Sequence, residues 1–300
     1  MGKAPRSLAG KVVAITGGGR GIGRATAAAL IAQGARVAIG DIESELAAQT
    51  ATELGAGTLG LALDVTDPES FESFLAAVER ELGPLDVVIN NAGIMPLGPF
   101  VAETEATSHR LVDINLNGVL TGSRLALKRF LPRGRGHLVN IASVAGKAGF
   151  PGGATYCATK HAVVGLSEAI IAEHRGSGVD VTIIMPTVVN TALGSGLPKT
   201  RGLRFAEPEE VAGAIVEALQ TGRVEVYVPS HLGPLVRSRS LVSRRVAEFV
   251  VRALKADQVL ARPDHAARAD YEAKMSDAAA DPEPAGSESV SGEQAQPQPA

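Results

Sequence analysis

The sequence predicts an α/β fold in which a doubly wound, parallel seven-stranded sheet lies between two layers of helices. From residue 11 to about residue 228, short runs rich in β-branched residues alternate with longer Ala- and Leu-rich stretches, a pattern typical of βα units. The short runs are apolar almost throughout, as expected of strands that are covered on both faces. One domain therefore accounts for most of the 300 residues, although length alone would allow two.

The expected strands and helices follow one another in order along the chain. The strands are predicted at residues 11–16, 35–40, 58–63, 85–90, 137–142, 180–185 and 224–228. A Gly-rich turn leads from the first strand into the helical stretch GIGRATAAALIAQG. Asp67-Pro68 and Glu207-Pro208 open two further helices, because proline in a first turn gives up an N–H that has no helical partner.

Composition and charge exclude several classes of protein. Aromatic residues make up 3% of the chain, with no Trp, and the net charge is -3, so we expect no nucleic-acid partner. The single cysteine, Cys157, excludes an internal disulfide and fits the cytoplasm, and the six histidines show no metal-ligand spacing. No apolar run approaches the roughly 20 residues that cross a bilayer, and the N-terminus does not resemble a signal peptide.

Beyond residue 229 the composition changes twice. We divide the chain into an α/β domain at 1–229, a basic helical extension at 230–276 and a disordered acidic tail at 277–300. Within the extension, residues 235–254 place apolar side chains on one helical face and arginines on the other. Such a helix packs on the body or on a neighbouring subunit, or it rests on an anionic membrane surface.

The turn after the first strand has the features of a pyrophosphate site. It reads TGGGRGIG at 16–23, and its glycines allow backbone N–H groups to approach an anion at the start of a helix. The spacing Gly-x-x-x-Gly-x-Gly differs from the usual G-x-G-x-x-G pattern. The residues expected to contact the cofactor here are Gly17, Arg20, Gly21, Ile22 and Gly23.

Asp41, at the end of the second strand, favours NAD as the cofactor. It lies 18 residues after Gly23, where a carboxylate can accept hydrogen bonds from a ribose 2′-hydroxyl and would repel a 2′-phosphate. Arg20 points the other way, because a cation in the turn could meet a 2′-phosphate or could pair with a nearby carboxylate. We give Asp41 more weight, which leaves NADP as the less favoured cofactor.

A serine, a tyrosine and a lysine form the candidate catalytic group. Ser143 follows the fifth strand, Tyr156 comes thirteen residues later, and Lys160 stands four residues after Tyr156, on the same face of a helix. A tyrosine that acts as a base near neutral pH needs its pKa lowered by about three units. The Lys160 ammonium, helped by the positive ring of an oxidised nicotinamide, can supply that shift.

These motifs together resemble the short-chain dehydrogenase/reductase family. The elements that match, in the family's order and spacing over about residues 8–229, are TGGGRGIG at 16–23, Asp64-Val65, NNAG at 90–93, Asn115, Ser143, Tyr156 and Lys160. The resemblance implies a Rossmann-type sheet, hydride transfer at a nicotinamide ring and proton transfer through a tyrosine. It also implies a homodimer or homotetramer that assembles through the helices holding Asn115 and Tyr156.

The resemblance further implies roles for single residues. Tyr156 would be the general acid/base, Ser143 would hold the substrate oxygen, and Lys160 would bind the nicotinamide ribose and lower the Tyr156 pKa. Asn115 would kink its helix and help to hold a proton-relay water. Asn90 would brace the sheet. The remaining cofactor contacts implied are Asp64, Val65, Asn91, Ala92, Gly93, Pro186, Val189 and Thr191.

Two segments need separate interpretation. Thr187 stands where the family usually has glycine after Pro186, and a β-branched residue there restricts the backbone and adds bulk near the nicotinamide. Residues 192–207 occupy the place of the family's substrate loop, and its Lys199, Arg201 and Arg204 would attract an anionic substrate or simply be solvated. Cys157 is interpreted as a packing residue.

The sequence thus predicts an NAD(H)-dependent oxidoreductase that acts on a secondary alcohol or ketone. An apolar substrate of steroid, retinoid or fatty-alcohol type is suggested by the amphipathic extension. The alternatives are a nucleotide-binding sensor or scaffold that has lost catalysis, and an NADP-dependent ketoreductase. A serine hydrolase is disfavoured because the chain has no Gly-x-Ser-x-Gly motif.

Overall fold

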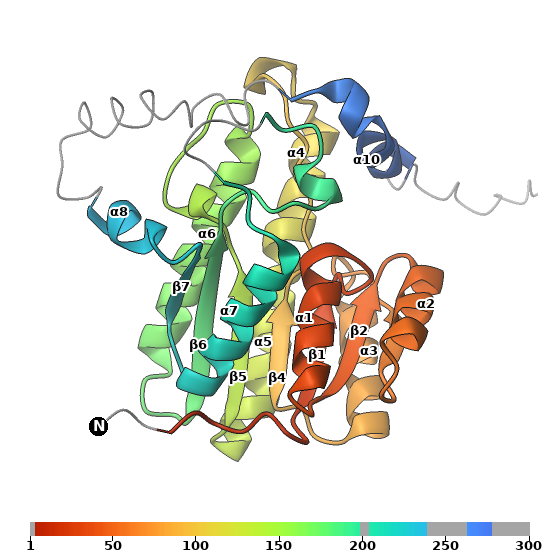
Figure 1. The fold of residues 1–300 in the computed structure, drawn as a ribbon, viewed down its shortest axis with the longest axis vertical. Coiled ribbons are helices and arrows are strands. Elements are labelled where there is room, and N and C mark those ends of the chain that lie inside the picture. Colours follow the sequence, from red (N-terminus) through yellow and green to blue (C-terminus); the bar gives the residue numbers. More distant parts are fainter. Residues whose placement is uncertain (1–3, 199–203, 239–262, 278–300) are drawn as a thin grey trace, which may run out of the picture.

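The computed structural model describes residues 4–198, 204–238 and 263–277, and it confirms the three-layer α/β architecture (Figure 1). One parallel sheet has the strand order β3-β2-β1-β4-β5-β6-β7. Each strand overlaps a range predicted from the sequence. The strands are β1 (Val12–Thr16), β2 (Arg36–Asp41), β3 (Leu59–Ala62), β4 (Val87–Asn90), β5 (Gly136–Ile141), β6 (Val179–Pro186) and β7 (Glu225–Val228).

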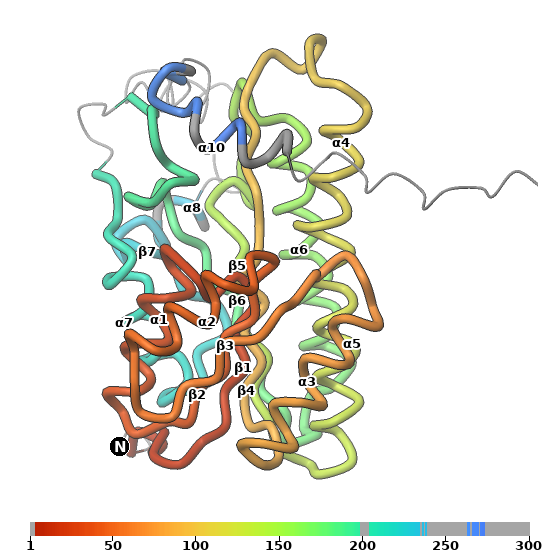
Figure 2. Tube along the Cα trace, turned by 90° about the vertical axis from the view of Figure 1, so that its right-hand side faces the viewer, coloured from red at the N-terminus to blue at the C-terminus, as the bar shows by residue number. Residues whose placement is uncertain are grey.

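Helices cover both faces of the sheet (Figure 2). One layer holds α1 (Gly21–Ala32), α2 (Ser44–Leu54) and α7 (Pro208–Thr221), and the other holds α3 (Pro68–Leu82), α5 (Gly118–Phe130) and α6 (Ala154–Glu173). The shorter helical elements are η1 (Phe100–Ala102), α4 (Glu105–Val112), η2 (Asp113–Asn117), η3 (Leu131–Arg133), η4 (Val144–Gly146), η5 (Ala192–Gly194), α8 (Leu232–Ser238) and α10 (His265–Asp277). A buried apolar core lies on each side of the sheet.

The two helix starts predicted from proline are confirmed. The Asp67 side chain accepts a hydrogen bond of 2.9 Å from the Glu69 N–H and caps α3, with Pro68 in the first turn. At α7 the Glu207 and Glu210 side chains cap each other's backbone N–H groups. Local sequence therefore fixes where these two helices begin.

The strand order places a crevice between β1 and β4. From β1 the chain continues through β2 and β3 toward one edge of the sheet. It then returns to the middle, where β4 lies beside β1, and continues through β5, β6 and β7 toward the other edge. In such sheets the connections diverge at the carboxyl ends of the two central strands and leave room for a ligand. The glycine turn after β1 and the NNAG segment after β4 both lie at this point.

Part of the C-terminal extension lies within the described residues. The helix α8 packs beside β7, and α10 lies over the carboxyl ends of the strands, near η5 (Figure 1). Residues 239–262, which hold most of the predicted amphipathic helix, lie outside the described residues, as do Lys199, Arg201 and the tail from residue 278. In the described ranges, no helix combines the length and apolarity that a membrane span requires.

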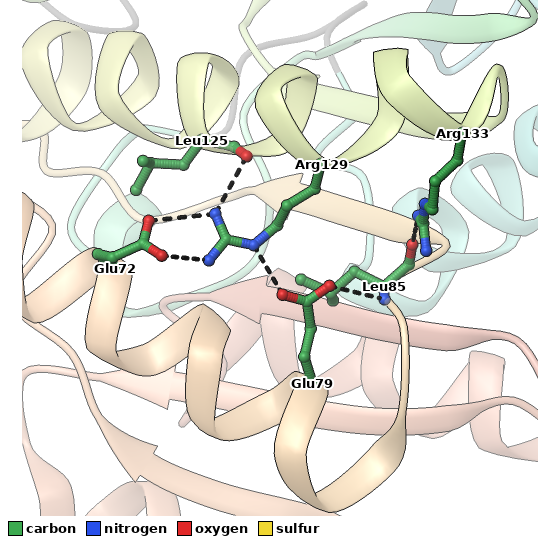
Figure 3. A network of polar contacts seen from close by, with 6 residues as sticks. All are labelled: Glu72, Glu79, Leu85, Leu125, Arg129 and Arg133. Carbon is green, nitrogen blue, oxygen red and sulfur yellow. Dashed lines mark hydrogen bonds and ion pairs between the residues drawn. The ribbon is translucent and has the colours of Figure 1, made fainter.

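A network of charges ties α3 to α5 on the face of the sheet that α3, α5 and α6 cover (Figure 3). The Arg129 side chain is 14% exposed and pairs with Glu72 and Glu79, with 2.9 Å between Arg129 Nε and Glu79 Oε2. Glu79 also accepts a hydrogen bond from the Leu85 N–H, just before β4. The largely buried Arg129 guanidinium thus links α3 to α5, and Glu79 links α3 to the segment before β4.

We expect Arg129→Met to lower the free energy of unfolding by about 2 kcal/mol near neutral pH, because it leaves two carboxylates without their cation. The hydrogen bond from Arg129 lowers the Glu72 pKa below its ordinary 4.5. The stabilisation is therefore present above that ordinary value and is lost as the pH falls through the lowered pKa. Urea unfolding near neutral pH and at about pH 3 checks both expectations.

Arg80→Met is the matched control. Arg80 lies on α3, pairs with its neighbour Glu81, and is 70% exposed. We expect its loss to change stability by no more than about 0.5 kcal/mol. Equal losses in the two variants would contradict the importance of the Arg129 network.

Candidate active site

The glycine turn forms a tight cradle between β1 and α1. Gly17 and Gly21 adopt positive φ angles of 63° and 53°. A Cβ atom at residue 23 would lie 2.2 Å from the Gly17 carbonyl oxygen, so no side chain fits there. The N-cap residue of α1, Arg20, makes no side-chain cap, which leaves the first N–H groups of the helix to meet an anion. Ile22 packs against the core beneath.

Thr16 and Asn91 hold this cradle to β4. The Thr16 hydroxyl accepts hydrogen bonds of 3.0 Å from the N–H groups of Asn91 and Ala92. The Asn91 amide donates to the carbonyl oxygens of Thr16 and Gly17, at 2.9 Å each. Asn91 therefore braces the turn. Asn90 donates to Asn140 across β4 and β5 at 2.8 Å, as expected of a residue that braces the sheet.

Asp41 lies beside the glycine turn, where the sequence predicted it. Its buried carboxylate accepts hydrogen bonds from the N–H groups of Gly19, at 3.0 Å, and Glu43, at 3.3 Å. Arg20 forms an ion pair with Glu43, so its guanidinium meets a carboxylate. This corner of the cradle therefore carries two carboxylates and one paired arginine, which suits a hydroxyl better than a phosphate.

Asp64 and Val65 line the same crevice after β3. Asp64 Oδ1 accepts hydrogen bonds from the N–H and the hydroxyl of Thr66, at 2.8 and 2.7 Å. Val65 is buried, and a Cβ atom at residue 118 would lie 3.0 Å from its Cγ2 atom. Val65 thus packs against the start of α5, and Asp64 shapes its own loop.

Ser143, Tyr156 and Lys160 come together at the carboxyl ends of β5 and β6. Ser143 Oγ donates to the Pro186 carbonyl at 3.3 Å and accepts from the Ala145 N–H at 3.1 Å. Tyr156 and Lys160 lie one turn apart on α6, with Lys160 Nζ 5.8 Å from the centre of the Tyr156 ring. The Lys160 ammonium also donates to the Ile141 carbonyl at 2.9 Å.

Asn115 sits in a π-helical turn between α4 and α5. The turn, η2, breaks the regular helix at the residue for which a kink was expected. The buried Asn115 amide accepts from the Ile94 N–H at 2.8 Å and donates to the Ile94 carbonyl at 2.9 Å. A Cβ atom at residue 93 would lie 3.2 Å from Asn115 Oδ1 and 3.7 Å from Lys160 Nζ. Gly93 therefore allows both groups to approach.

Burial favours the neutral forms of the central tyrosine and lysine. It raises the pKa of Tyr156 well above its ordinary value of 10, although the hydrogen bond with Ser143 acts in the opposite direction. It also lowers the pKa of Lys160 to about 8. The lowering of the Tyr156 pKa expected from Lys160 together with an oxidised cofactor stays a prediction, because in the protein without cofactor desolvation is the largest influence on that pKa.

The segment after β6 faces the cradle. Thr191 lies over the turn, since a Cβ atom at residue 21 would come within 3.1 Å of its methyl carbon. Val189 is buried and forms an isolated parallel bridge with Ala206, which closes the base of the following loop. Thr187 extends the pairing of β6 with β7: its N–H and hydroxyl donate to the Val228 carbonyl at 2.9 and 3.3 Å.

Threonine at position 187 needs no glycine-like backbone. Among the described residues other than glycine, only Ala56 has a positive φ angle. The hydroxyl of Thr187 is directed to the end of β7, and the expected bulk near the nicotinamide stays a prediction. Thr187, at the position where the family usually has glycine, is thus accommodated by hydrogen bonds to the end of β7.

Apolar side chains pack around Tyr156. Met95, Leu97, Leu111, Ala145, Cys157 and Leu197 form one buried cluster with Tyr156, and Ile94, Phe150, Val188, Leu193 and Phe205 pack against it. Cys157 belongs to this packing, and burial raises the pKa of its thiol. Arg204 is exposed and pairs with Glu210 at 2.7 Å.

Three residues in contact with this site escaped the sequence analysis. Thr16 is the last residue of a strand, and only its hydroxyl distinguishes it from its apolar neighbours. Arg268 and Tyr271, on α10, reach the loops after β4 and β6. No motif marks them, because their partners are backbone atoms distant in sequence. Across residues 4–198, 204–238 and 263–277, no group of three or more His, Cys, Asp or Glu side chains could hold a metal ion.

Comparison with protein families and curated proteins gives consistent matches. The family model for short chain dehydrogenases matches residues 11–202. A sorbitol dehydrogenase from Cereibacter sphaeroides is 37% identical over 223 residues, which is 73% of this chain and 87% of the relative. A 3-alpha-(or 20-beta)-hydroxysteroid dehydrogenase from Mycobacterium tuberculosis is 37% identical over 213 residues, which is 70% of this chain and 82% of the relative.

Comparison with solved structures gives the same fold. A crystal structure of a short chain dehydrogenase/reductase from Burkholderia phymatum, in complex with NAD, superposes with a TM-score of 0.72. The match covers 78% of this chain and 94% of that one, at 26% sequence identity. The similarity in fold therefore extends over most of both chains.

Proposed function

Because the chain belongs to the short-chain dehydrogenase/reductase family, we propose that Tyr156 moves the proton in hydride exchange between NAD and a secondary alcohol or ketone. The broader activity follows from the family: the protein is an oxidoreductase that acts on CH–OH groups with a nicotinamide cofactor. The observation that carries the finer proposal is the buried Tyr156, set between Ser143 and Lys160 at the carboxyl edge of the sheet.

NAD fits the cradle described above. Gly17, Gly21 and Gly23 leave space for a pyrophosphate at the start of α1, and Asp41 would accept hydrogen bonds from the adenosine ribose. Val65, Ala92 and Gly93 would border the adenosine side, while Pro186, Val189 and Thr191 would border the nicotinamide. When bound, the cofactor supplies the acceptor or donor of the hydride.

The residues of the chain would handle the proton and the substrate oxygen. In alcohol oxidation the substrate loses a hydride and its hydroxyl proton, and the Tyr156 oxygen receives the proton. Ser143 would hold the substrate oxygen from its place beside Tyr156. Lys160 would bind the nicotinamide ribose and favour the phenolate, and Asn115 would keep a proton path open to Lys160. The positive charge that Tyr156 still needs fits an oxidised nicotinamide ring.

An apolar substrate fits the surroundings of Tyr156 best. The side chains that cluster with Tyr156, among them those of Met95 and Leu197, are apolar. Apolar walls bind through burial of apolar surface. We therefore extend the proposal to bulky secondary alcohols or ketones, of the steroid, retinoid or fatty-alcohol kind.

Two alternatives remain distinct from this proposal. A nucleotide-binding sensor of the same fold would bind NAD without turnover, and the presence of Asn115, Ser143, Tyr156 and Lys160 in one site argues against it. An NADP-dependent ketoreductase would need a cation free to meet a 2′-phosphate. Arg20 is paired with Glu43, which favours NAD.

The larger organisation of the chain is also a proposal. We assign residues 1–229 to the catalytic domain and 230–276 to an extension, part of which, α10, packs on that domain. A homodimer or homotetramer would form through the helices around Asn115 and α6. Membrane contact through residues 235–254 concerns residues that lie mostly outside the described part of the chain.

Replacing Tyr156 by Phe should abolish turnover and leave NAD binding intact. The change removes the hydroxyl that moves the proton, and we expect the rate to fall by at least about a hundredfold. Turnover with a panel of secondary alcohols, followed by absorbance of reduced nicotinamide, and NAD binding by calorimetry measure the two effects. Tyr227→Phe, which removes a hydroxyl from β7, is the control. Unchanged turnover in Tyr156→Phe would refute the mechanism.

Replacing Asp41 by Asn should weaken the preference for NAD. Loss of the carboxylate removes a charge-assisted hydrogen bond to the ribose and the repulsion of a 2′-phosphate, so kcat/KM for NAD should fall about tenfold and that for NADP should rise. Glu53→Gln, on the exposed side of α2, should change neither value. A wild-type protein that already prefers NADP would overturn the role given to Asp41.

A further inference from the structure

The C-terminal helix α10 is fastened to two loops that border the active site. Its first turn begins at Asp264, whose N–H donates to the Gly196 carbonyl at 2.8 Å and whose side chain caps the helix. Both views show α10 lying above the carboxyl edge of the sheet, beside the segment after β6 (Figures 1 and 2). The family match ends at residue 202, so α10 lies beyond it.

Arg268 joins the two loops through its guanidinium group. The side chain is fully buried, and its Nη1 atom donates to the carbonyls of Leu193, at 3.1 Å, and Ser195, at 2.8 Å. Its Nη2 atom donates to the Met95 carbonyl at 2.8 Å. Glu272 Oε1 lies 3.4 Å from Arg268 Nε. A buried cation is stable only while its partners stay in place, so these carbonyls and α10 hold one another in a single arrangement.

Tyr271 holds the same loop from its other side. Its hydroxyl accepts a hydrogen bond of 2.8 Å from the Met95 N–H, and its ring lies under the Arg268 guanidinium, 5.0 Å away. The N–H and the carbonyl of Met95 are therefore both bound by α10. Burial is the main cause that raises the Tyr156 pKa, and Tyr271 adds to it, which puts the two tyrosines within electrostatic reach.

The loops that α10 holds supply the apolar wall next to Tyr156. Met95 and Leu197 belong to the buried cluster that contains Tyr156, and Leu193 packs against it. The residue before Met95, Ile94, is held by Asn115 from the opposite direction. The apolar wall therefore lies between α10 on one side and the helical segments that hold Asn115 and Tyr156 on the other, and its position depends on both.

We infer that α10 is part of the substrate site, with Arg268 and Tyr271 as positioning residues that hold the loops at Met95 and at residues 193–197 against a bulky apolar alcohol. This inference rests on the proposed function for its substrate. Its structural part, the clamp on the loops, stands on the contacts of Arg268 and Tyr271. The C-terminal extension thus determines substrate specificity by holding loops of its own chain in place.

Two full-length variants test the clamp. Arg268→Met removes all three carbonyl contacts, and Tyr271→Phe removes only the acceptor of the Met95 N–H. Hydrogen–deuterium exchange followed by mass spectrometry should show exchange at least about tenfold faster in peptides covering residues 94–97 and 193–197. Arg80→Met and Tyr227→Phe are the controls and should leave these peptides unchanged. If Arg268→Met does not fold, Tyr271→Phe decides on the peptide at Met95.

Steady-state kinetics test the positioning role. For octan-2-ol, cyclohexanol and a hydroxysteroid, we expect KM to rise about tenfold in Arg268→Met, with kcat within about threefold of wild type and the Kd for NAD unchanged. Unchanged exchange in both variants would overturn the clamp. Faster exchange with unchanged KM would overturn the positioning role. A wild type that turns over none of these alcohols would overturn the proposed function instead, while the exchange result would still decide on the clamp.

Discussion

A phenol and an amine lie buried together on one face of α6, four residues apart, and burial opposes the charged form of each. The surrounding structure supplies what this pair requires. Asn115 holds the loop beside it, Ser143 lies against the tyrosine, and the residue at 93 is a glycine because a side chain would press on Asn115. These segments converge on the pair at the carboxyl edge of the sheet, near the glycine turn after β1.

Close packing also determines which residues can form the glycine turn that would bind the cofactor. Residue 23 must lack a Cβ atom because the Gly17 carbonyl lies against it, and Thr16 and Asn91 bind the turn to β4. Asp41 and the Arg20–Glu43 pair occupy the corner where a ribose would lie. Backbone contacts hold the glycine turn in place, and we expect the charges of Asp41, Arg20 and Glu43 to select the nucleotide that binds there.

The sequence predicted the strands, the glycine turn and the catalytic group because those features are local: apolar runs, glycine spacing, and residues four apart on a helix. It predicted a lowered pKa for Tyr156 beside Lys160 and an oxidised cofactor; in the protein without cofactor, burial, which depends on the whole packed structure, raises that pKa. It also missed Arg268 and Tyr271, whose partners are main-chain atoms more than seventy residues away. No residue pattern encodes such contacts.

We propose that the protein alone keeps Tyr156 neutral and that the charge of a bound oxidised cofactor is needed to form the phenolate. Ultraviolet absorbance titration of the wild type, minus that of Tyr156→Phe, reports this single phenol with and without NAD. Without NAD, we expect no ionisation of Tyr156 up to about pH 11, and with NAD the transition should move down by several pH units. Ionisation at about pH 9 or below without NAD would contradict the claim.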